Sequence, residues 1–395
     1  MFSDMKKLTI RNFGPLAEAN LDLDRVNLIV GLQSSGKSCA LKTACYCSWV
    51  EKRIELAQSA DAFSKGSDFL DNLCDYHKMK DYICPDTFIE YESQCVKFAY
   101  DHAKRKFSFK WKRAHWDYKR PKISYVPSER NLLATIPMWS KLPLESDNLL
   151  DFMTDWDVAR KQINQVNNIL ELGLSYRYDS KSNTDAIIMP SGNSIRLTEG
   201  SSGMQSLLPL FVHLNYLFDP KSRDQDDLRQ SYEQKEERKR LVKLIASYLH
   251  AKKDKSKGSE LLKSTTWEGQ NFYFRNIDEC DRFDELVDNH LATHHNEIFL
   301  EEPENNLFPP TQCQLVNWLL EKMSEIDWMN ILFVATHSPY VLNQFIKECS
   351  KGLRLFITHP DAKSGKYIIK QLSDDDVREI YGNGIDLFFN FEAYR

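Results

Sequence analysis

The stretch Gly31-Leu32-Gln33-Ser34-Ser35-Gly36-Lys37-Ser38 decides the fold. It follows an apolar, strand-like run over 26–30 and precedes a helical spacing of apolar residues that continues to about Leu56. Glycines at such a junction let main-chain N–H groups curl around an anion, and the start of the helix adds a favourable potential for negative charge. Every fixed position of the pattern G-x-x-x-x-G-K-[ST] is present. The stretch therefore predicts a phosphate-binding (Walker A) loop within an α/β fold.

This loop gives each of its polar residues an expected role in holding ATP. Lys37 would pair with the β- and γ-phosphates, and the Ser38 hydroxyl would ligate Mg²⁺. The rest of the loop would surround the phosphates with its main chain and short side chains. These phosphate-binding positions are Gly31, Gln33, Ser34, Ser35 and Gly36.

Two adjacent acids, Glu301 and Glu302, follow a second strand-like run over 297–300. In an α/β sheet the carboxyl ends of parallel strands border the crevice in which ligands bind. We expect Glu301 to reach Mg²⁺, directly or through water, and Glu302 to orient or deprotonate the attacking water. Taken alone, two acids after a strand are also typical of a solvated turn. The phosphate loop favours the catalytic interpretation.

A histidine follows the next strand-like run. Residues 331–335 are apolar and β-branched, and they end in Thr336-His337-Ser338. His337 is expected beside the γ-phosphate, where it would sense the loss of that group. Strands alternating with helices of this length indicate a sheet with parallel character.

A third candidate site precedes the apolar helix predicted from Leu207. The segment 198–206 contains Ser202, Gly203 and Gln205, with Ser202 as the expected N-cap. Main-chain donors at the start of a helix form an anion site. Because the Walker loop already fills the phosphate site of its own subunit, this second site is expected to serve the nucleotide of another subunit. An ordinary Ser/Gly helix cap is the alternative.

Two segments stand apart from this pattern. Residues 58–122 are irregular and aromatic-rich, which predicts a strand-rich lobe. Between 219 and 263, 22 of 45 residues are charged, with apolar residues at Leu241, Leu244, Ile245, Tyr248 and Leu249. This composition predicts a solvated helical arm with one apolar stripe, which could dock a partner protein or be a decoration without a partner.

One basic, aromatic stretch leaves nucleic acid open as a partner. Residues 104–122 hold nine basic residues and one acid, with aromatic residues interleaved. Phosphate neutralisation with base stacking would suit nucleic acid. The alternation of Phe107, Phe109 and Trp111 with polar residues instead predicts a half-buried antiparallel strand.

The composition of the chain argues against a membrane-spanning or secreted protein. It has 395 residues, of which 42% are hydrophobic, and 52 basic against 57 acidic residues give a net charge of -5. No apolar run approaches the ~18 residues of a membrane span, and the first residues do not resemble a signal peptide. Nine cysteines without a Cys-x-x-Cys pair favour reduced thiols in the cytoplasm over disulfides or structural zinc.

Taken together, these motifs resemble an ABC-type ATPase of the SMC and RecF kind, and within it the overcoming-lysogenization-defect (OLD) family. The resemblance rests on the Walker loop and on five further segments. These are Arg11–Pro15, Tyr125–Asn131, Ser202-Gly203, Glu301–Pro309 and Thr336–Pro339. It implies one α/β P-loop ATPase domain of ABC/SMC-head type over 1–395, with a mixed sheet, an antiparallel lobe and a helical insertion arm.

Several positions depart from that pattern. Glu301 stands where such ATPases usually have Asp, and Met204 replaces the second glycine of the signature. The glutamine of the Q-loop has one weak candidate, Gln94. The 58 residues after His337 are too few for the Toprim nuclease domain of OLD proteins.

The resemblance implies a homodimer or higher homo-oligomer that sandwiches ATP head-to-tail, with Mg²⁺. It further implies a switch that controls a separate effector, a nuclease or toxin, in antiphage defence of the Septu, retron-linked or PARIS-like kind. Two alternatives stay open: a RecF-like DNA-repair ATPase that acts on DNA directly, and a scaffold that holds ATP without hydrolysing it.

Overall fold

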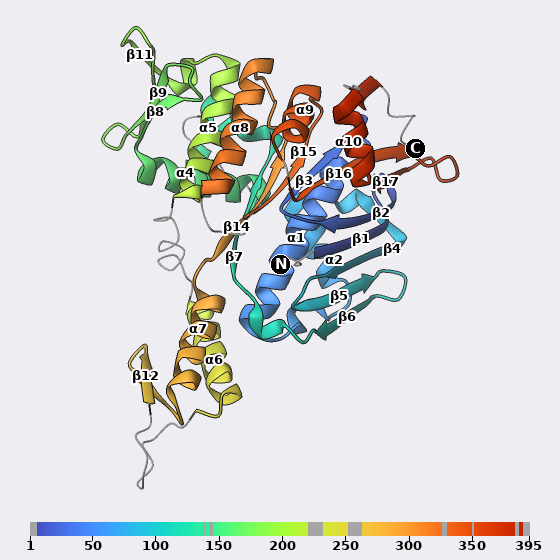
Figure 1. Ribbon diagram of the computed structural model, residues 1–395, viewed down its shortest axis with the longest axis vertical. Coiled ribbons are helices and arrows are strands. Elements are labelled where there is room, and N and C mark those ends of the chain that lie inside the picture. Colours follow the sequence, from blue (N-terminus) through green and yellow to red (C-terminus); the bar gives the residue numbers. More distant parts are fainter. Residues whose placement is uncertain are drawn as a thin grey trace.

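The centre of the molecule is an eleven-stranded mixed sheet (Figure 1). The computed structural model of the chain describes residues 6–136, 139–141, 145–219, 232–251, 263–325, 330–349, 351–383 and 387–389. Five strands of the sheet run parallel, and all five residues of the central strand β3 are buried, as in parallel sheets covered on both faces. In spatial order this parallel part comprises β16 (Leu353–Pro360), β3 (Val26–Val30), β15 (Ile331–Ala335), β14 (His295–Glu301) and β7 (Pro121–Val126).

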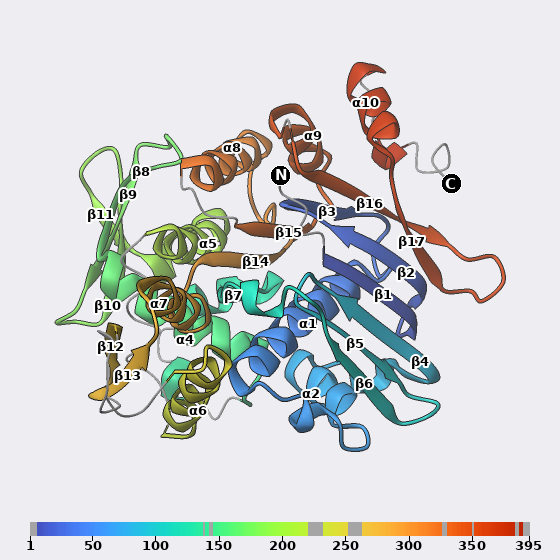
Figure 2. The same ribbon diagram turned by 60° about the horizontal axis from the view of Figure 1, so that its bottom comes forward.

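The other half of the sheet is an antiparallel lobe (Figure 2). Strand β17 (Tyr367–Gln371) joins it to the parallel half. The α/β fold with a mixed sheet and an antiparallel lobe is confirmed. The lobe comprises, from its edge inward, β6 (Lys106–Trp111), β5 (Val96–Asp101), β4 (Ile83–Glu92), β1 (Lys6–Phe13) and β2 (Leu16–Leu23).

The basic, aromatic stretch forms the edge of this lobe. Phe107 is buried, Phe109 and Trp111 are partly buried, and the alternate residues Lys106, Ser108 and Lys110 are exposed. The sheet interpretation therefore accounts for the alternation. Nucleic-acid binding by the stretch stays a prediction.

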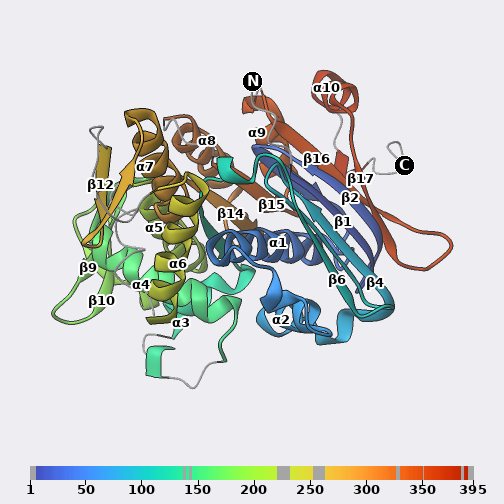
Figure 3. The same cartoon turned by 90° about the horizontal axis from the view of Figure 1, so that it is seen from below.

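Helices cover both faces of the sheet (Figures 1 and 3). The longest, α1, follows β3 and packs against β7, β14 and β15. The described helices are α1 (Lys37–Ala57), α2 (Asp68–His77), α3 (Leu132–Thr135), α4 (Asn148–Ile163), α5 (Ser202–Phe218), α6 (Tyr232–Tyr248), α7 (Ile277–Leu291), α8 (Pro309–Glu325), α9 (Pro339–Glu348) and α10 (Asp374–Asn383). None of these is both long and apolar enough to cross a membrane.

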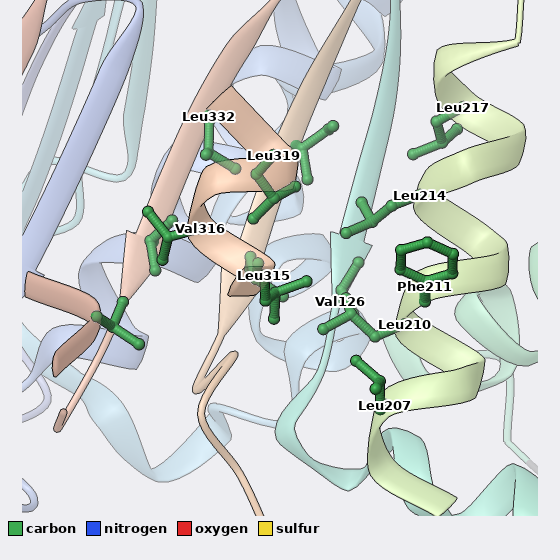
Figure 4. Packing of buried hydrophobic residues seen from close by; sticks show 14 of the residues in the cluster. Val126, Leu207, Leu210, Phe211, Leu214, Leu217, Leu315, Val316, Leu319 and Leu332 are labelled. Carbon is green, nitrogen blue, oxygen red and sulfur yellow. The ribbon is translucent and has the colours of Figure 1, made fainter. Parts of the chain in front are cut away.

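A leucine-rich core joins α5 and α8 to the parallel strands (Figure 4). Leu210 and Leu214 of α5 face Val126 of β7, while Leu315 and Leu319 of α8 lie between them and β15. All five side chains are nearly or fully buried, and each contributes about 1.5–3 kcal/mol to stability. This core fixes α5, and with it the predicted signature segment, on the sheet.

The apolar spacing of the sequence predicts a helix over about 149–172, and this prediction is wrong at its end. Helix α4 ends at Ile163, and Asn164, with a φ of 56°, turns the chain into β8. This strand begins a four-stranded antiparallel sheet beside α4 and α5, whose pairing overrides the helical spacing. The sheet consists of β8 (Gln165–Ile169), β9 (Leu174–Asp179), β10 (Thr184–Ile188) and β11 (Ser194–Arg196).

The arm predicted over 219–263 is described only in part, because 220–231 and 252–262 lie outside the described residues. Its helix α6 projects from the sheet together with α7 and the hairpin of β12 (Lys263–Trp267) and β13 (Gln270–Phe274) (Figure 1). Leu241 and Ile245 are buried in a small core with Phe283 of α7. Much of the apolar stripe is therefore satisfied within this chain, which corrects the expectation of a free docking stripe. Leu244 and Tyr248 are exposed, and Tyr248 stacks on Trp116.

Candidate functional site

The loop between β3 and α1 has a shape that requires its glycines. Gly31 has a φ of 152°, and a Cβ there would lie 1.8 Å from the Thr358 hydroxyl oxygen. Gly36 has a φ of 95°, and a Cβ there would lie 2.4 Å from Leu16. The Thr358 hydroxyl also donates to Ser35 Oγ at 2.7 Å, which ties the loop to the neighbouring strand β16. Side chains thus lie so close to the loop that residues with a Cβ would not fit at positions 31 and 36.

Lys37 folds back over this loop. Its ammonium donates to the carbonyl oxygens of Gly31 at 3.0 Å and Leu32 at 2.6 Å. Burial lowers the pKa of Lys37 to about 8, although the carboxylates of Glu302 and Glu304 act in the opposite direction. The positive charge of the site therefore lies between the loop and the acids that follow β14.

The start of α1 offers free main-chain donors. Gly36 is the N-cap, no side chain of the described residues caps the helix, and its first turn contains no acidic residue. The first N–H groups of a helix lack partners within the helix, and its dipole favours an anion there. Gln33, Ser34 and Ser38 are exposed beside these groups. The loop can therefore hold phosphate groups, with Ser38 open to the same side.

Glu301 ends β14 with one carboxylate oxygen unsatisfied. Its side chain is buried, and Oε1 has no hydrogen-bond partner among the described residues. A buried, unpaired carboxylate oxygen is costly unless a cation or water satisfies it. Carboxylate and hydroxyl oxygens are ligands that Mg²⁺ accepts. Glu301 and Ser38 therefore fit a Mg²⁺ ion.

Glu302 and His337 meet at the ends of neighbouring parallel strands. Their side chains approach to 3.5 Å between Oε1 and Nε2. Burial, together with the charge of Lys37, lowers the pKa of His337 to about 4, so the ring is neutral at pH 7. Burial raises the pKa of Glu302, and its acidic neighbours Glu304 and Glu301 raise it further. A carboxylate with a raised pKa is suited to accept a proton.

The backbone of Glu302 is itself unusual, because its φ of 42° lies in the left-handed region. Two contacts hold it there: its N–H donates to the carbonyl of Ala335 at 2.8 Å, and its carbonyl accepts from Arg130 at 2.6 Å. Strained residues persist where their surroundings over-determine them, and they cluster at functional sites.

Arg130 and Glu304 were not assigned a role from the sequence. Arg130 is fully buried, and its guanidinium donates to the carbonyls of Glu301 at 2.9 Å and Glu302. Glu304 accepts from the Thr336 hydroxyl at 2.8 Å and from the N–H of His337 at 2.6 Å. Both residues lie in motifs on which the family resemblance rests. Their partners are main-chain atoms, however, so the spacing of residue types in the sequence does not indicate these contacts.

The third segment, at the start of α5, lies against the loop after β14. A Cβ on Gly203 would be 3.0 Å from the carbonyl of Asn306, whose side chain donates to Ser206 at 2.8 Å. Ser202 is the first residue of the helix and Ser201 is its N-cap, because Ser201 is extended and its hydroxyl accepts from the N–H of Met204. The expectation that Ser202 is the cap is therefore wrong.

The structure brings the first two motifs together, while the third packs against the loop after β14. Within the described part of the chain, no hydrogen bond joins Ser202, Gly203 or Gln205 to residues 31–38; the amide of Gln205 donates to the carbonyl of Thr198 at 3.0 Å instead. Gln94 lies in the turn between β4 and β5.

Comparisons with known proteins return distant likenesses among solved structures. No family model matches the chain, and no curated protein matches it. Among solved structures, the SMC head domain from Thermotoga maritima is 12% identical with a TM-score of 0.42, over 94% of this chain and 99% of that one. RecF of the RecFOR pathway is 11% identical with a TM-score of 0.30, over 94% and 99% of the two chains. The ADP form of an ABC-transporter ATP-binding cassette, MJ1267, is 10% identical with a TM-score of 0.33, over 96% of each.

Proposed function

We propose that the chain binds ATP with Mg²⁺ at this site and hydrolyses it. The observation that supports this most directly is the meeting of four groups at one end of the parallel strands. Lys37 lies within the electrostatic reach of Glu302 and of His337, Glu302 contacts His337, and Glu301 ends strand β14, the neighbour of β15, with an unpaired oxygen. Groups brought together from three separate segments match the parts that phosphoryl transfer requires.

Each residue then has a task that its surroundings support. The loop 31–36 and the start of α1 surround the phosphates, and the Lys37 ammonium exchanges its contacts with the loop carbonyls for the phosphate oxygens. Glu301 and Ser38 would hold Mg²⁺, which neutralises charge on the phosphates when bound. Glu302 accepts a proton from the attacking water, and the neutral His337 helps to orient that water and the γ-phosphate.

We further propose that the complete site needs two copies of the chain. The start of α5 makes no described hydrogen bond to its own Walker loop, so a second copy would supply Ser202, Gly203 and Gln205. Large apolar side chains are exposed around the site: Leu32 is 52% exposed, Phe308 72% and Tyr340 50%. Exposed apolar side chains in one place favour association, here of two copies placed head-to-tail across ATP.

We also propose a biological role for ATP hydrolysis by this chain, on the basis of the motif resemblance. The OLD-like motifs favour a role in antiphage defence, in which the nucleotide state controls a separate nuclease or toxin. Under this proposal, the purified chain cuts neither DNA nor RNA. Nuclease activity that survives substitution of Glu301 and Glu302 would contradict that division of labour.

Calorimetric titration of ATP with Mg²⁺ tests the binding site. Lys37→Ala should abolish the binding seen with the unchanged chain, because the loop loses its one ammonium. Lys363→Ala, in an exposed turn, is the matched control and should bind normally. Equal affinity in the unchanged chain and in Lys37→Ala would overturn the assignment.

A further inference from the structure

A cavity of about 760 Å³ lies outside the nucleotide site, between α1, α2, α4 and β7. Four consecutive residues of β7, 122–125, line it. Successive side chains of a strand point to opposite faces of the sheet, so consecutive residues can share one cavity only at the strand's edge. Accordingly, the side chain of Ser124 bonds His213 of α5, while the ring of Tyr125 contacts His77 of α2.

That edge of β7 is open within the described part of the fold. Strand β7 ends the eleven-stranded sheet, and β14 is its one described neighbour (Figure 2). An edge strand presents a row of main-chain donors and acceptors to whatever lies beside it. Lys52 covers the first of them, the carbonyl of Pro121, at 2.9 Å. The cavity is therefore bordered by main-chain groups with which a further strand could pair.

The charge of the residues that line the cavity indicates which side chains an added strand would carry. Three carboxylates line it, Asp75, Asp151 and Asp155; Lys122 in the same lining pairs with Asp155 at 3.4 Å, and Lys80 pairs with Asp75 at 2.8 Å. The aromatic side chains of Tyr46 and Trp49 lie beside them and stack on each other. An acidic, aromatic-walled groove is complementary to an extended segment that carries basic side chains with long aliphatic stems.

We propose that this cavity is the docking site for an extended, basic segment of a partner protein, which adds a strand to the free edge of β7. Main-chain hydrogen bonds to β7 would hold the segment, and its lysine or arginine side chains would lie among the three aspartates. The proposal rests on none of the ATP chemistry, and binding is measured without nucleotide, so its failure and that of the proposed function are separate results.

Fluorescence anisotropy tests the proposal with the full chain and a fluorescein-labelled decapeptide that alternates lysine with valine and threonine. The peptide should bind, and a counterpart with glutamate in place of lysine should not. N-methylation of alternate backbone nitrogens keeps the charge but removes the main-chain donors, so it should weaken binding about tenfold or more. Equal binding of the parent and the N-methylated peptide would overturn the proposal.

Substitutions in the protein locate the site. Asp151→Asn with Asp155→Asn should weaken binding of the basic peptide by about tenfold or more. Asp278→Asn with Asp281→Asn, two exposed positions on α7, removes the same charge elsewhere and should change nothing. If both double variants weaken binding equally, the peptide responds to net charge and the cavity is not its site. Because the peptide variants leave the protein unaltered, a folding defect in the aspartate variant cannot hide the answer.

Discussion

The carboxylate of Glu304 accepts a hydrogen bond from the main-chain N–H of His337, at 2.6 Å. Its second oxygen accepts from the Thr336 hydroxyl at 2.8 Å. One side chain thus ties the loop after β14, which carries Glu301 and Glu302, to the loop after β15. Glu304 therefore sets the spacing between Glu302 and His337, the acid and the histidine that we propose act together.

Glu304→Ala should therefore lower kcat for ATP hydrolysis about 10- to 100-fold and leave the affinity for ATP nearly unchanged, because His337 loses its anchor. Glu304→Gln retains an acceptor oxygen and should keep most of the rate. Steady-state kinetics beside calorimetric affinities separates the two effects. A parallel loss of affinity in Glu304→Ala would show instead that the loop has collapsed.

The pKa of Lys37 predicts how affinity for ATP depends on pH. Since burial lowers that pKa to about 8, the empty loop holds an ammonium below pH 8 and loses it above. Affinity should be level below pH 8 and fall as pH rises through it, by up to about tenfold per pH unit. Titration calorimetry between roughly pH 7 and pH 9 measures this. Lys37→Arg, which stays charged, should not show the fall.

Glu302→Gln should bind ATP and hydrolyse it at least about 100-fold more slowly, because the amide cannot accept the proton from water. Retained ATP should also hold two copies together, which light scattering would detect as a doubled mass. Glu285→Gln, on the exposed face of α7, makes the same chemical change away from the site and serves as the control. Normal turnover in Glu302→Gln would place the base elsewhere.

Stability should depend on an ion pair between the antiparallel lobe and the parallel strands. Lys6 of β1 pairs with Glu297 of β14, and Glu51 lies 3.7 Å from the same ammonium. Lys6→Met leaves buried Glu297 without its ammonium partner, so urea denaturation should show a loss of about 3–5 kcal/mol in the free energy of unfolding. Lys7→Met, the exposed neighbour that pairs with Asp22, should change stability by less than about 0.5 kcal/mol.

The same pair gives a pH dependence with a definite sign. Although burial alone would raise the pKa of Glu297, Lys6 and His295 hold it well below its usual range. A depressed pKa contributes stability above the pKa of the unfolded chain, about 4.3, and this is lost as pH falls further. The free energy of unfolding of the unchanged chain should therefore drop below about pH 4.3. Lys6→Met should show less of that drop.

The sequence predicted those parts of the molecule whose signal is local. The phosphate loop, the strand that ends at Glu301 and the strand that ends at Ala335 are each marked by residues adjacent in the chain, and the structure places them side by side. The helix over 149–172 failed because its apolar spacing continues past Asn164, where a left-handed residue and pairing with β9 turn the chain into a strand.

Contacts between residues far apart in the chain explain why the other features were not predicted. The apolar stripe of α6 looks free in the sequence, because its partners in α7 and β13 follow it at a distance in the chain. Arg130 and Glu304 form hydrogen bonds with main-chain atoms of loops that follow other strands: Arg130 with the loop after β14, and Glu304 with the loop after β15. The cavity at the edge of β7 depends on the strand order of the sheet, which cannot be predicted from any single segment of the sequence.

Complementation of two inactive variants tests the central claim, that two copies of this chain form the ATP site together. Ser202→Arg blocks the surface offered to the partner, and Lys37→Ala removes the phosphate-binding ammonium; each alone should hydrolyse ATP at a small fraction of the normal rate. A mixed pair retains one intact site, made of Lys37 from one copy and Ser202 from the other. A mixture of equal amounts should therefore exceed the sum of the separate rates several-fold. Rates that merely add at every mixing ratio would contradict the shared site.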